Sequence, residues 1–519
     1  MRKKFAIVLK PLGAILLLLI LTAALLHFLA AKPVNWPAFA AMAFFYLIIF
    51  AIGAYAAGLR EKEDTSGFML ADRKMPLWLG VFTMSATWIG GGYINGTAEY
   101  AATSGLVWVQ APWGYALSLI VGGLIFARPM RRQGYQTMLD PLENRFGKKM
   151  TALLFIPALS GELFWTAAIL SALGSTFAVI VGLDTSSAII LSAIITIIYT
   201  ILGGLWAVAL TDVVQLILLF VGLFLVVPFA LESQGGLSNA WMAYKAHYGA
   251  AASLLPSREA LGSYYWNWWD SALLLIFGGI PWQVYFQRVL ASKNEKTAVY
   301  LSIFAGLVCL VAAIPPLLCG IVATTAEWSI PPPDGSSTLP WVIRYLTPEW
   351  VGIIGLGAIA GAVMSSADSS ILSASSMAAW NVWRPFSRKK LSDQQLQQLI
   401  RRLIGIVGVA AILIALQAKS VYSLWFLCSD FVYCLLFPAL VSALFDPKAN
   451  TYGAISGFLV ALVLRFGGGD ATLGIPTFLP YPMMEDGICL FPFRTLAMVS
   501  GLVTIFVVSR WINRREVSA

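Results

Sequence analysis

Aromatic side chains stand beside two stretches of glycine and proline that interrupt hydrophobic segments. Trp88 lies in the first stretch, residues 87–93, and Trp282 ends the second, residues 278–282. Trp88 follows Lys74 by 14 residues, which at about 1.5 Å per residue places it roughly 21 Å along a helix, within the membrane. Aromatic faces attract a cation that cannot donate hydrogen bonds, so these rings predict a cage for a quaternary ammonium group. The aromatic candidates are Trp88, Tyr115, Trp165 and Trp282, with Tyr93 and Tyr285 beside the two stretches.

The two stretches themselves indicate a site. Glycine and proline inside a membrane helix free backbone carbonyl and amide groups, which persist in lipid only when they are buried in protein or face a cavity. Kinked packing helices are the alternative interpretation. The residues singled out for this reason are Gly90, Gly91, Gly279 and Pro281.

Carboxylates within apolar spans need an explanation because each costs roughly 2.5–3.5 kcal/mol at a helix centre. Asp368 stands in the run 364–370, where serine hydroxyls cluster beside it on a helix. Oxygen atoms are the ligands that hard cations such as Na⁺ prefer, so we favour ion coordination over hydrogen bonding between helices. The remaining acidic residues are open to structural roles as caps or ion pairs. The acidic candidates are Glu162, Asp212, Asp270, Asp368 and Asp430.

The elements that must position these residues are hydrophobic spans. The chain has 519 residues, of which 59% are hydrophobic and 11% charged, too few polar residues to cover a soluble protein of this size. We expect an all-α polytopic membrane protein with about 14 spans. They fall at 5–31, 37–58, 76–99, 104–128, 150–181, 184–205, 206–231, 264–285, 296–324, 350–381, 399–418, 420–445, 452–465 and 493–510.

Each break begins a block of five spans, the third to seventh and the eighth to twelfth, as in transporters built from inverted repeats. With alternating spans, we assign about 27 of the 34 Lys and Arg residues to cytoplasmic segments, and both termini then face the cytoplasm. The net charge of +9 is therefore a signal of topology, and nucleic acid is not an expected partner.

We divide the chain into three parts. Residues 1–36 form an additional N-terminal hydrophobic helix, favoured as a retained span over a signal peptide. Residues 37–510 form the transport domain, and 511–519 form a short cytoplasmic tail. The five cysteines and two histidines show neither metal-ligand spacing nor a disulfide framework. The serine-rich helix has no histidine or lysine placed as a base, so we expect a transporter and not an enzyme.

The chain resembles the high-affinity choline transporters of the sodium/solute symporter family over roughly residues 37–510. Long and specific strings carry this resemblance. They are residues 82–99, 110–112, 137–141, 155–158, 211–215, 278–282, 285–290 and 364–376. Leu210, just before one string, departs from the tyrosine that is usual in the family, which leaves any role of that hydroxyl in doubt.

The resemblance implies a LeuT-type core of ten helices in two inverted repeats, with one or two extra helices before it and two after. It implies a substrate cage of Trp88, Tyr115, Trp165 and Trp282, with Trp425 as a weaker addition. It also implies a sodium site and, at Asp368, an adjoining second one. The sodium-site residues are Ala86, Ile89, Ala362, Ser365 and Ser366. Chloride dependence is implied too, although no residue constellation independently indicates an anion site.

The function expected from these features is sodium-coupled uptake of choline across the cell membrane by alternating access, at the inner membrane if the source is a Gram-negative bacterium. Betaine, carnitine or another trimethylammonium compound is the nearest rival, because a cage reads the headgroup better than the tail. A choline sensor that does not transport is disfavoured, since only nine residues follow Arg510. The sequence gives no oligomeric state.

Overall fold

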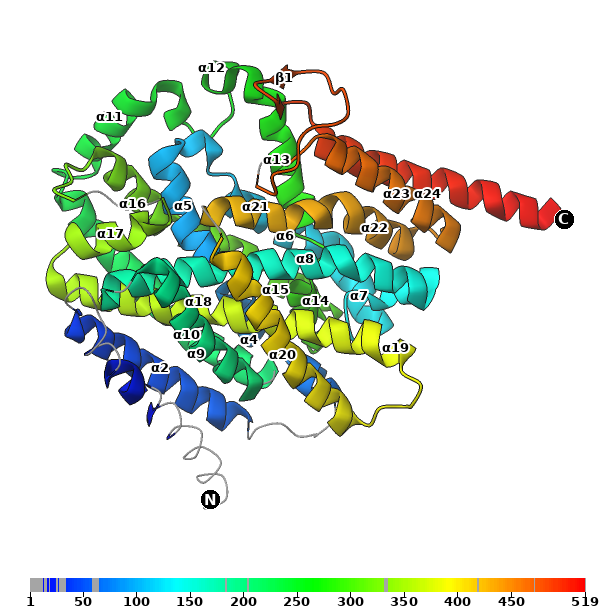
Figure 1. Ribbon diagram of the computed structural model, residues 1–519, viewed down its shortest axis with the longest axis horizontal. Coiled ribbons are helices and arrows are strands. Elements are labelled where there is room, and N and C mark those ends of the chain that lie inside the picture. The colour runs from blue at the N-terminus through cyan, green and yellow to red at the C-terminus, as the bar shows by residue number, and fades with distance from the viewer. Residues whose placement is uncertain are drawn as a thin grey trace.

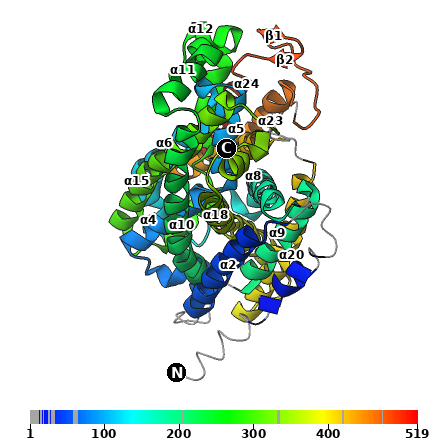
Figure 2. The same cartoon turned by 90° about the vertical axis from the view of Figure 1, so that its left-hand side faces the viewer.

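The computed structural model describes residues 34–57, 65–182, 184–202, 205–330, 335–417, 420–470 and 472–518, with parts of 13–27. Most of the first predicted span, and most of the segment 1–36, lies outside these residues. Within them the regular structure is helical apart from one antiparallel hairpin of β1 (Met484–Glu485) and β2 (Ile488–Cys489). The prediction of an all-α membrane protein is confirmed at this level (Figures 1 and 2).

Ten helical segments of the described residues are long and apolar enough to cross a membrane. They are built from α2 (Trp36–Ala57), α6 (Ala111–Val121), α8 (Asp140–Val181), α10 (Leu205–Glu232), α13 (Tyr265–Gly278), α14 (Gln283–Ala291), α15 (Glu295–Ala312), α16 (Ile314–Thr325), α18 (Glu349–Met377), α20 (Asp393–Ala415), α21 (Val421–Phe431), α22 (Phe437–Phe445) and α24 (Phe493–Ser518). Three π-helical turns, Gly122–Ala127, Ala378–Trp383 and Val432–Leu436, continue α6, α18 and α21.

Shorter helices complete the bundle. Two more apolar helices are α9 (Thr185–Leu202) and α23 (Thr451–Gly467), and a broken pair consists of α4 (Leu77–Trp88) and α5 (Gly91–Thr103). The short connecting helices are α3 (Thr65–Leu70), α7 (Arg128–Gln133), α11 (Leu237–Tyr248), α12 (Arg258–Leu261), α17 (Thr338–Tyr345) and α19 (Arg384–Phe386).

Two helices are interrupted where the sequence places glycine and proline. Between α4 and α5, Ile89 (φ −85°, ψ 61°) and Gly90 (φ −91°, ψ −173°) leave the helical conformation. A side chain at Gly90 would collide with Ser366 of α18, so only glycine permits this close approach. Between α13 and α14, Pro281 lacks an N–H and Trp282 is extended (φ −116°, ψ 135°). The prediction of two broken helices is confirmed.

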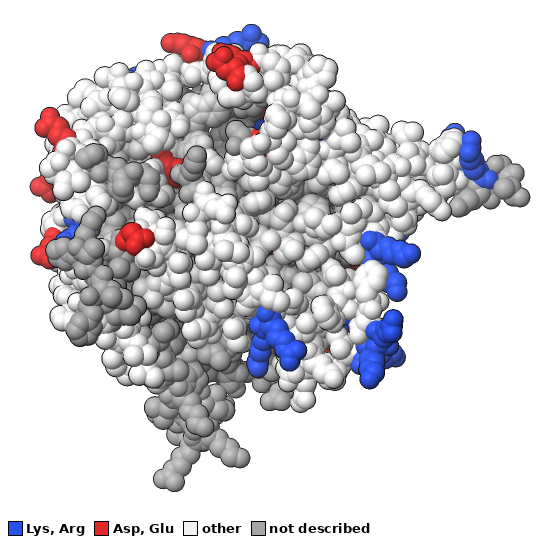
Figure 3. Space-filling view, in the orientation of Figure 1, with Lys and Arg blue, Asp and Glu red and all other residues white. Residues whose placement is uncertain are grey.

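Helix α18 lies at the centre of the bundle and packs against α2, α8, α9, α10 and α20 (Figure 2). Its serines are buried although they are polar, which requires partners from the surrounding helices. On the face shown in Figure 3, Lys and Arg side chains gather at the end that carries α7, α19 and the end of α24. Asp and Glu gather toward the opposite side. On this face a basic end is thus distinct from the side on which the acidic side chains gather.

Candidate functional site

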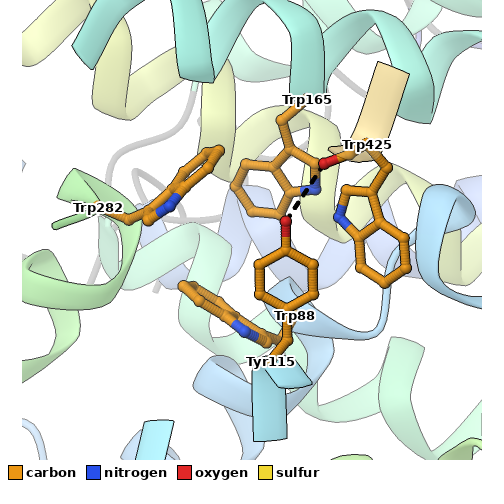
Figure 4. A pocket seen from close by; sticks show the side chains of 5 residues that line it. All are labelled: Trp88, Tyr115, Trp165, Trp282 and Trp425. Carbon is orange, nitrogen blue, oxygen red and sulfur yellow. Dashed lines mark hydrogen bonds between the residues drawn. The ribbon is translucent and has the colours of Figure 1, made fainter. Parts of the chain in front are cut away.

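Five aromatic side chains line one pocket in the middle of the bundle (Figure 4). They come from five elements, because Trp88 ends α4, Trp282 precedes α14, and the others belong to α6, α8 and α21. Each is at most 5% exposed, so the five rings close tightly around the pocket. We call this the aromatic pocket, and its residues are Trp88, Tyr115, Trp165, Trp282 and Trp425. The structure thus brings together the four predicted cage residues and the weaker addition, Trp425.

The rings of the aromatic pocket meet edge to face and face to face. Trp165 meets Trp88 with centroids 5.9 Å apart and Trp282 with centroids 5.2 Å apart, both in T-shaped contacts, and Tyr115 stacks on Trp425 at 4.8 Å. Aromatic pairs favour these arrangements. The result is a set of walls that present both faces and edges to the enclosed space.

Hydrogen bonds hold polar atoms of these rings against the protein backbone. The Trp282 indole N–H donates to the carbonyl of Gly278 at 2.6 Å. The Tyr115 hydroxyl donates to the carbonyl of Trp425 at 3.2 Å (Figure 4) and shares a hydrogen bond with the Ser429 hydroxyl. These contacts use polar atoms in the walls and leave π faces for a ligand, as a cation without hydrogen-bond donors requires.

Tyr93 and Tyr285, which the sequence also placed beside the breaks, stand behind the pocket. Tyr93 meets Trp425 at 5.6 Å and Tyr285 meets Trp88 at 6.3 Å between centroids. The Tyr93 hydroxyl donates to the carbonyl of Cys309. Both tyrosines therefore support lining rings without lining the pocket themselves.

Oxygen atoms gather where the end of α4 meets α18. The Ser365 hydroxyl donates to the carbonyl of Ala86 at 2.9 Å, and the Ser366 hydroxyl donates to the carbonyls of Thr87 at 2.7 Å and Ala86 at 3.3 Å. Ile89 caps α4 at this point. Ala362 lies in α18, and its side chain is outside what the structure describes. Four of the five predicted sodium-site residues thus sit at the first break.

A second group of polar side chains lies beside this contact and includes a fully buried arginine. The Arg288 guanidinium donates to the hydroxyls of Thr87 at 2.8 Å and Ser369 at 2.6 Å, and lies 3.7 Å from the carboxylate of Asp212. Asp368 accepts from Ser369 at 3.3 Å, and the Thr83 hydroxyl donates to Asp212. We call this the oxygen-rich cluster, and its residues are Thr83, Thr87, Asp212, Arg288, Asp368 and Ser369.

The sequence analysis assigned no role to Arg288, Thr83 or Thr87, whereas Ser369 lies in the serine run 364–370 for which it favoured ion coordination. Two buried oxygens in the cluster, Oδ1 of Asp212 and Oδ2 of Asp368, have no hydrogen-bond partner in the described part of the chain. Buried carboxylates need a countercharge, so a basic residue at membrane depth could have been predicted as their partner. Arg288 is such a residue, because it stands six residues after Trp282.

Three predicted carboxylates lie elsewhere. Glu162 of α8 accepts from the Ser370 hydroxyl at 2.9 Å. Asp430 pairs with Arg465 at 2.5 Å and with Arg494 at 2.8 Å. Asp270 lies 3.6 Å from the same Arg494 and accepts from the backbone N–H of Thr495 at 2.7 Å. Asp270 and Asp430 thus join one ion-pair network that fastens α24 to the bundle, a structural role that the sequence left open.

The other predicted glycines mark close helix contacts. A Cβ on Gly91 would lie 2.7 Å from Ala172 and 2.8 Å from Val363, and a Cβ on Gly279 would lie 2.5 Å from the Ser118 hydroxyl. All three distances are shorter than side-chain carbons tolerate. The broken helices therefore pack tightly against their neighbours, which places the aromatic pocket and the oxygen-rich cluster side by side.

A polytopic membrane protein with two discontinuous helices meeting at buried polar and aromatic sites has the build of a secondary transporter. The model of the sodium:solute symporter family matches residues 68–461. The chain belongs to the sodium:solute symporter family, whose members are sodium-coupled transporters and not enzymes.

Similar proteins agree with this assignment. A high-affinity choline transporter 1 from Caenorhabditis elegans is 46% identical over 498 residues, covering 90% of this chain and 84% of that protein. One from Homo sapiens is 46% identical over 487 residues, covering 90% and 83%. The structure of a Na⁺-coupled sialic acid symporter in a substrate-bound, outward-open state has a TM-score of 0.73 at 18% identity, covering 92% of this chain and 98% of that one. This last likeness shows the fold alone.

Proposed function

We propose that this protein carries choline into the cell together with sodium by alternating access. The observation that carries the proposal is the aromatic pocket, which lies where both helix breaks meet. Its five lining residues are uncharged, and their rings offer a quaternary ammonium group the faces it prefers. The two relatives that are 46% identical and named as high-affinity choline transporters support choline as the substrate.

We propose a sodium site at the first break. Its ligands are backbone carbonyls of Ala86 and Ile89, the carbonyl of Ala362 and the hydroxyls of Ser365 and Ser366. The two serines already contact carbonyls at the end of α4, which supports this set, because oxygen atoms are the ligands that Na⁺ favours. Asp368 belongs to an adjoining second sodium site, and its Oδ2 atom, without a hydrogen-bond partner in the described residues, supports that role.

The architecture that we propose has about 14 spans and a LeuT-type core. The first block runs from α4 to α10 and the second from α13 to α22, so each begins with a broken helix. One or two helices precede this core and two follow it. The transport domain covers 37–510, and residues 511–519 form the tail. We propose that both termini face the cytoplasm. The basic end visible in Figure 3 carries the end of α24 and supports this for the C-terminal side, because cytoplasmic segments carry an excess of Lys and Arg.

Sodium entry supplies the driving force. Each Na⁺ that moves inward gains about 2.3 kcal/mol per 100 mV of membrane potential, which adds to the inward attraction of choline itself. The broken helices are the hinges of the movement, because their interrupted backbone can bend without losing helical hydrogen bonds.

Choline uptake into proteoliposomes tests this function. We expect labelled choline to accumulate when sodium is high outside and to equilibrate slowly when sodium is equal on both sides. Uptake that ignores the sodium gradient would contradict symport. Replacement of chloride by gluconate in the same vesicles tests the predicted chloride dependence, for which we expect a lower rate of uptake.

A further inference from the structure

A second cavity lies next to the aromatic pocket and has a volume of about 210 Å³. This is well over ten times the roughly 10–15 Å³ that a single water molecule needs, so a small organic molecule fits. Its walls combine aromatic rings, an amide and charged groups. We call it the outer cavity, and the lining residues that bear on its ligand are Tyr100, Trp108, Gln110, Asn267, Phe426 and Asp430.

The outer cavity lies at the end of the bundle that is away from the C-terminus. Its residues come from the last turn of α5 and the first turns of α13, α21 and α24, and Figure 1 shows α5 and α13 far from the C-terminus. The basic end carries the opposite end of α24. Tyr100, Trp108 and Asn267 are only partly buried, so the cavity can be reached from the surface. With the termini in the cytoplasm, it faces the outside of the cell.

One layer of rings separates the outer cavity from the aromatic pocket. Tyr422 stacks on Tyr100 of the outer cavity with centroids 3.6 Å apart. It meets Trp425 of the aromatic pocket edge to face at 6.0 Å. The Tyr422 hydroxyl accepts hydrogen bonds from the backbone N–H groups of Gln110 and Ala111, both at 3.1 Å. A ligand in the outer cavity is therefore one ring away from the aromatic pocket, and Tyr422 is the wall that must move.

The charged groups around the outer cavity are paired with one another. Asp430 pairs with Arg494 at 2.8 Å and with Arg465 at 2.5 Å, and Arg465 also pairs with Asp470. An anionic ligand would have to compete with these carboxylates for the guanidinium groups. A quaternary ammonium group needs no such partner, because it binds to ring faces.

Gln110 offers the outer cavity an unused hydrogen-bond acceptor. Its side-chain NH₂ group donates to the carbonyl of Trp268 at 2.8 Å, which fixes the orientation of the amide because its oxygen cannot donate. The Oε1 atom of this fully buried side chain has no hydrogen-bond partner in the described part of the chain. A buried acceptor without a donor is costly, and the hydroxyl group of choline is a donor.

We propose that the outer cavity is an entry site that binds a quaternary ammonium alcohol before it reaches the aromatic pocket. The rings of Tyr100, Trp108 and Phe426 hold the headgroup, and Oε1 of Gln110 accepts the hydroxyl. Betaine has the same headgroup, but its carboxylate cannot donate to Gln110 and is repelled by the carboxylate of Asp430. This inference rests on the proposed function, because the entry site serves the same transport of choline.

Protection of an introduced cysteine tests the entry site. Asn267→Cys places a thiol in the wall of the outer cavity, and 2-(trimethylammonium)ethyl methanethiosulfonate, which carries the headgroup of choline, labels it. The labelling rate is followed by mass spectrometry of the purified protein in sodium buffer. The five native cysteines are buried, and the protein without the substitution is the blank. We expect choline to slow the labelling of Asn267→Cys.

Substitutions in the two cavities distinguish the entry site from the aromatic pocket. Trp88→Leu weakens the aromatic pocket and should leave the half-protecting choline concentration within about twofold, because the two sites are independent. Trp108→Leu removes a ring of the outer cavity and should raise that concentration about fivefold. Trp241→Leu is the matched control, since this tryptophan of α11 is 37% exposed and lines neither cavity.

The role of Gln110 is tested with propyltrimethylammonium, which has a methyl group where choline has its hydroxyl. Half-protection of Asn267→Cys should need about fivefold more of this ligand than of choline, because it cannot donate to Gln110. Gln110→Met removes the acceptor and should make the two ligands equal. Equal protection by both ligands without this substitution would contradict recognition of the hydroxyl in the outer cavity.

Labelling that choline does not slow would overturn the entry site and leave choline transport standing. A half-protecting concentration that rises in Trp88→Leu as much as choline affinity falls would also overturn it, because the protection would then report the aromatic pocket. Trp282→Leu gives the same comparison if Trp88→Leu does not fold. Absence of choline uptake by the wild-type protein would contradict the proposed function, and the entry role with it.

Discussion

The aromatic pocket and the oxygen-rich cluster are neighbours with opposite chemistry. Thr87 and Trp88 are consecutive residues at the end of α4, yet Thr87 belongs to the cluster and Trp88 to the pocket. In the pocket, hydrogen-bonding atoms of Tyr115 and Trp282 are tied to the walls. In the cluster, hydroxyl and carboxylate oxygens converge on one buried arginine. One broken helix thus borders the aromatic pocket with a ring and the oxygen-rich cluster with a hydroxyl group.

The largest effect should follow from removing the cation that holds the oxygen-rich cluster together. Arg288→Met leaves Asp212 buried without its partner, and breaking a buried pair in this way costs about 3–5 kcal/mol. We expect a clear fall in the thermal midpoint of the purified protein. The control is Arg132→Met, which removes an exposed arginine 3.1 Å from Glu295 and should leave the midpoint unchanged. Equal midpoints for both variants would mean that the cluster does not depend on Arg288.

The second largest effect should be a loss of choline binding, with little change in sodium binding, when a ring of the aromatic pocket is removed. Trp88→Leu removes a face of the aromatic pocket, and desolvated cation–π contacts contribute about 2 kcal/mol or more. We expect choline affinity to fall about 30-fold or more, with sodium half-saturation little changed. Trp78→Leu, on the same helix but 55% exposed, should bind choline like the wild type. A parallel loss of choline and sodium affinity in Trp88→Leu would erase the distinction between the regions.

A substitution at the proposed sodium site should weaken sodium binding and leave choline binding unchanged, and its effect should be smaller than that of Trp88→Leu. Ser366→Ala removes one hydroxyl ligand, and we expect the sodium concentration for half-maximal uptake to rise about tenfold, with choline affinity at saturating sodium unchanged. Ser375→Ala is the control, because that serine lies on the same helix and donates to the carbonyl of Ile371 within it. A wild-type sodium dependence in Ser366→Ala would remove this residue from the site.

The smallest effect concerns the orientation of a ring. Tyr115→Phe keeps the aromatic face and loses the hydrogen bonds to Trp425 and Ser429, so choline affinity should fall about threefold. The control is Tyr433→Phe, whose hydroxyl contacts Thr495 at 3.2 Å and lines no part of the pocket. If binding measurements gave a loss as large as that of Trp88→Leu, the hydroxyl itself would have to contact the ligand.

Much of the fold was predictable because lipid restricts the choices. Hydrophobic length predicted an all-helical membrane protein, and glycine and proline located both interruptions, at Gly90 and at Pro281. The packing of α18 in the centre was not predictable, because its serines fit both ion coordination, which we favoured, and contacts between helices. Only the neighbours on α4, such as Ala86 and Thr87, show that the hydroxyls of Ser365 and Ser366 point to the first break.

The site was predictable in part for a different reason. Trp88 and Trp282 lie in the long strings that carry the family resemblance, and the other three aromatic residues were implied by the resemblance itself. Spacing alone does not bring Tyr115 and Trp425, some 310 residues apart, into contact. Arg288 was not predicted because only the acidic residues of the apolar spans were singled out as needing partners. Asp430 is likewise buried because a basic residue pairs with it, and that residue, Arg465, stands in another helix of the bundle.

The aromatic pocket draws its five rings from five different elements, and this has a consequence for any measured affinity. A ligand that needs all five rings binds only those molecules in which the rings have gathered. If about one molecule in a hundred holds them together, the observed Kd is about a hundredfold weaker than the intrinsic one. A substitution that favours the gathered state therefore tightens choline binding without touching a ring, and sodium bound at the first break acts in the same way.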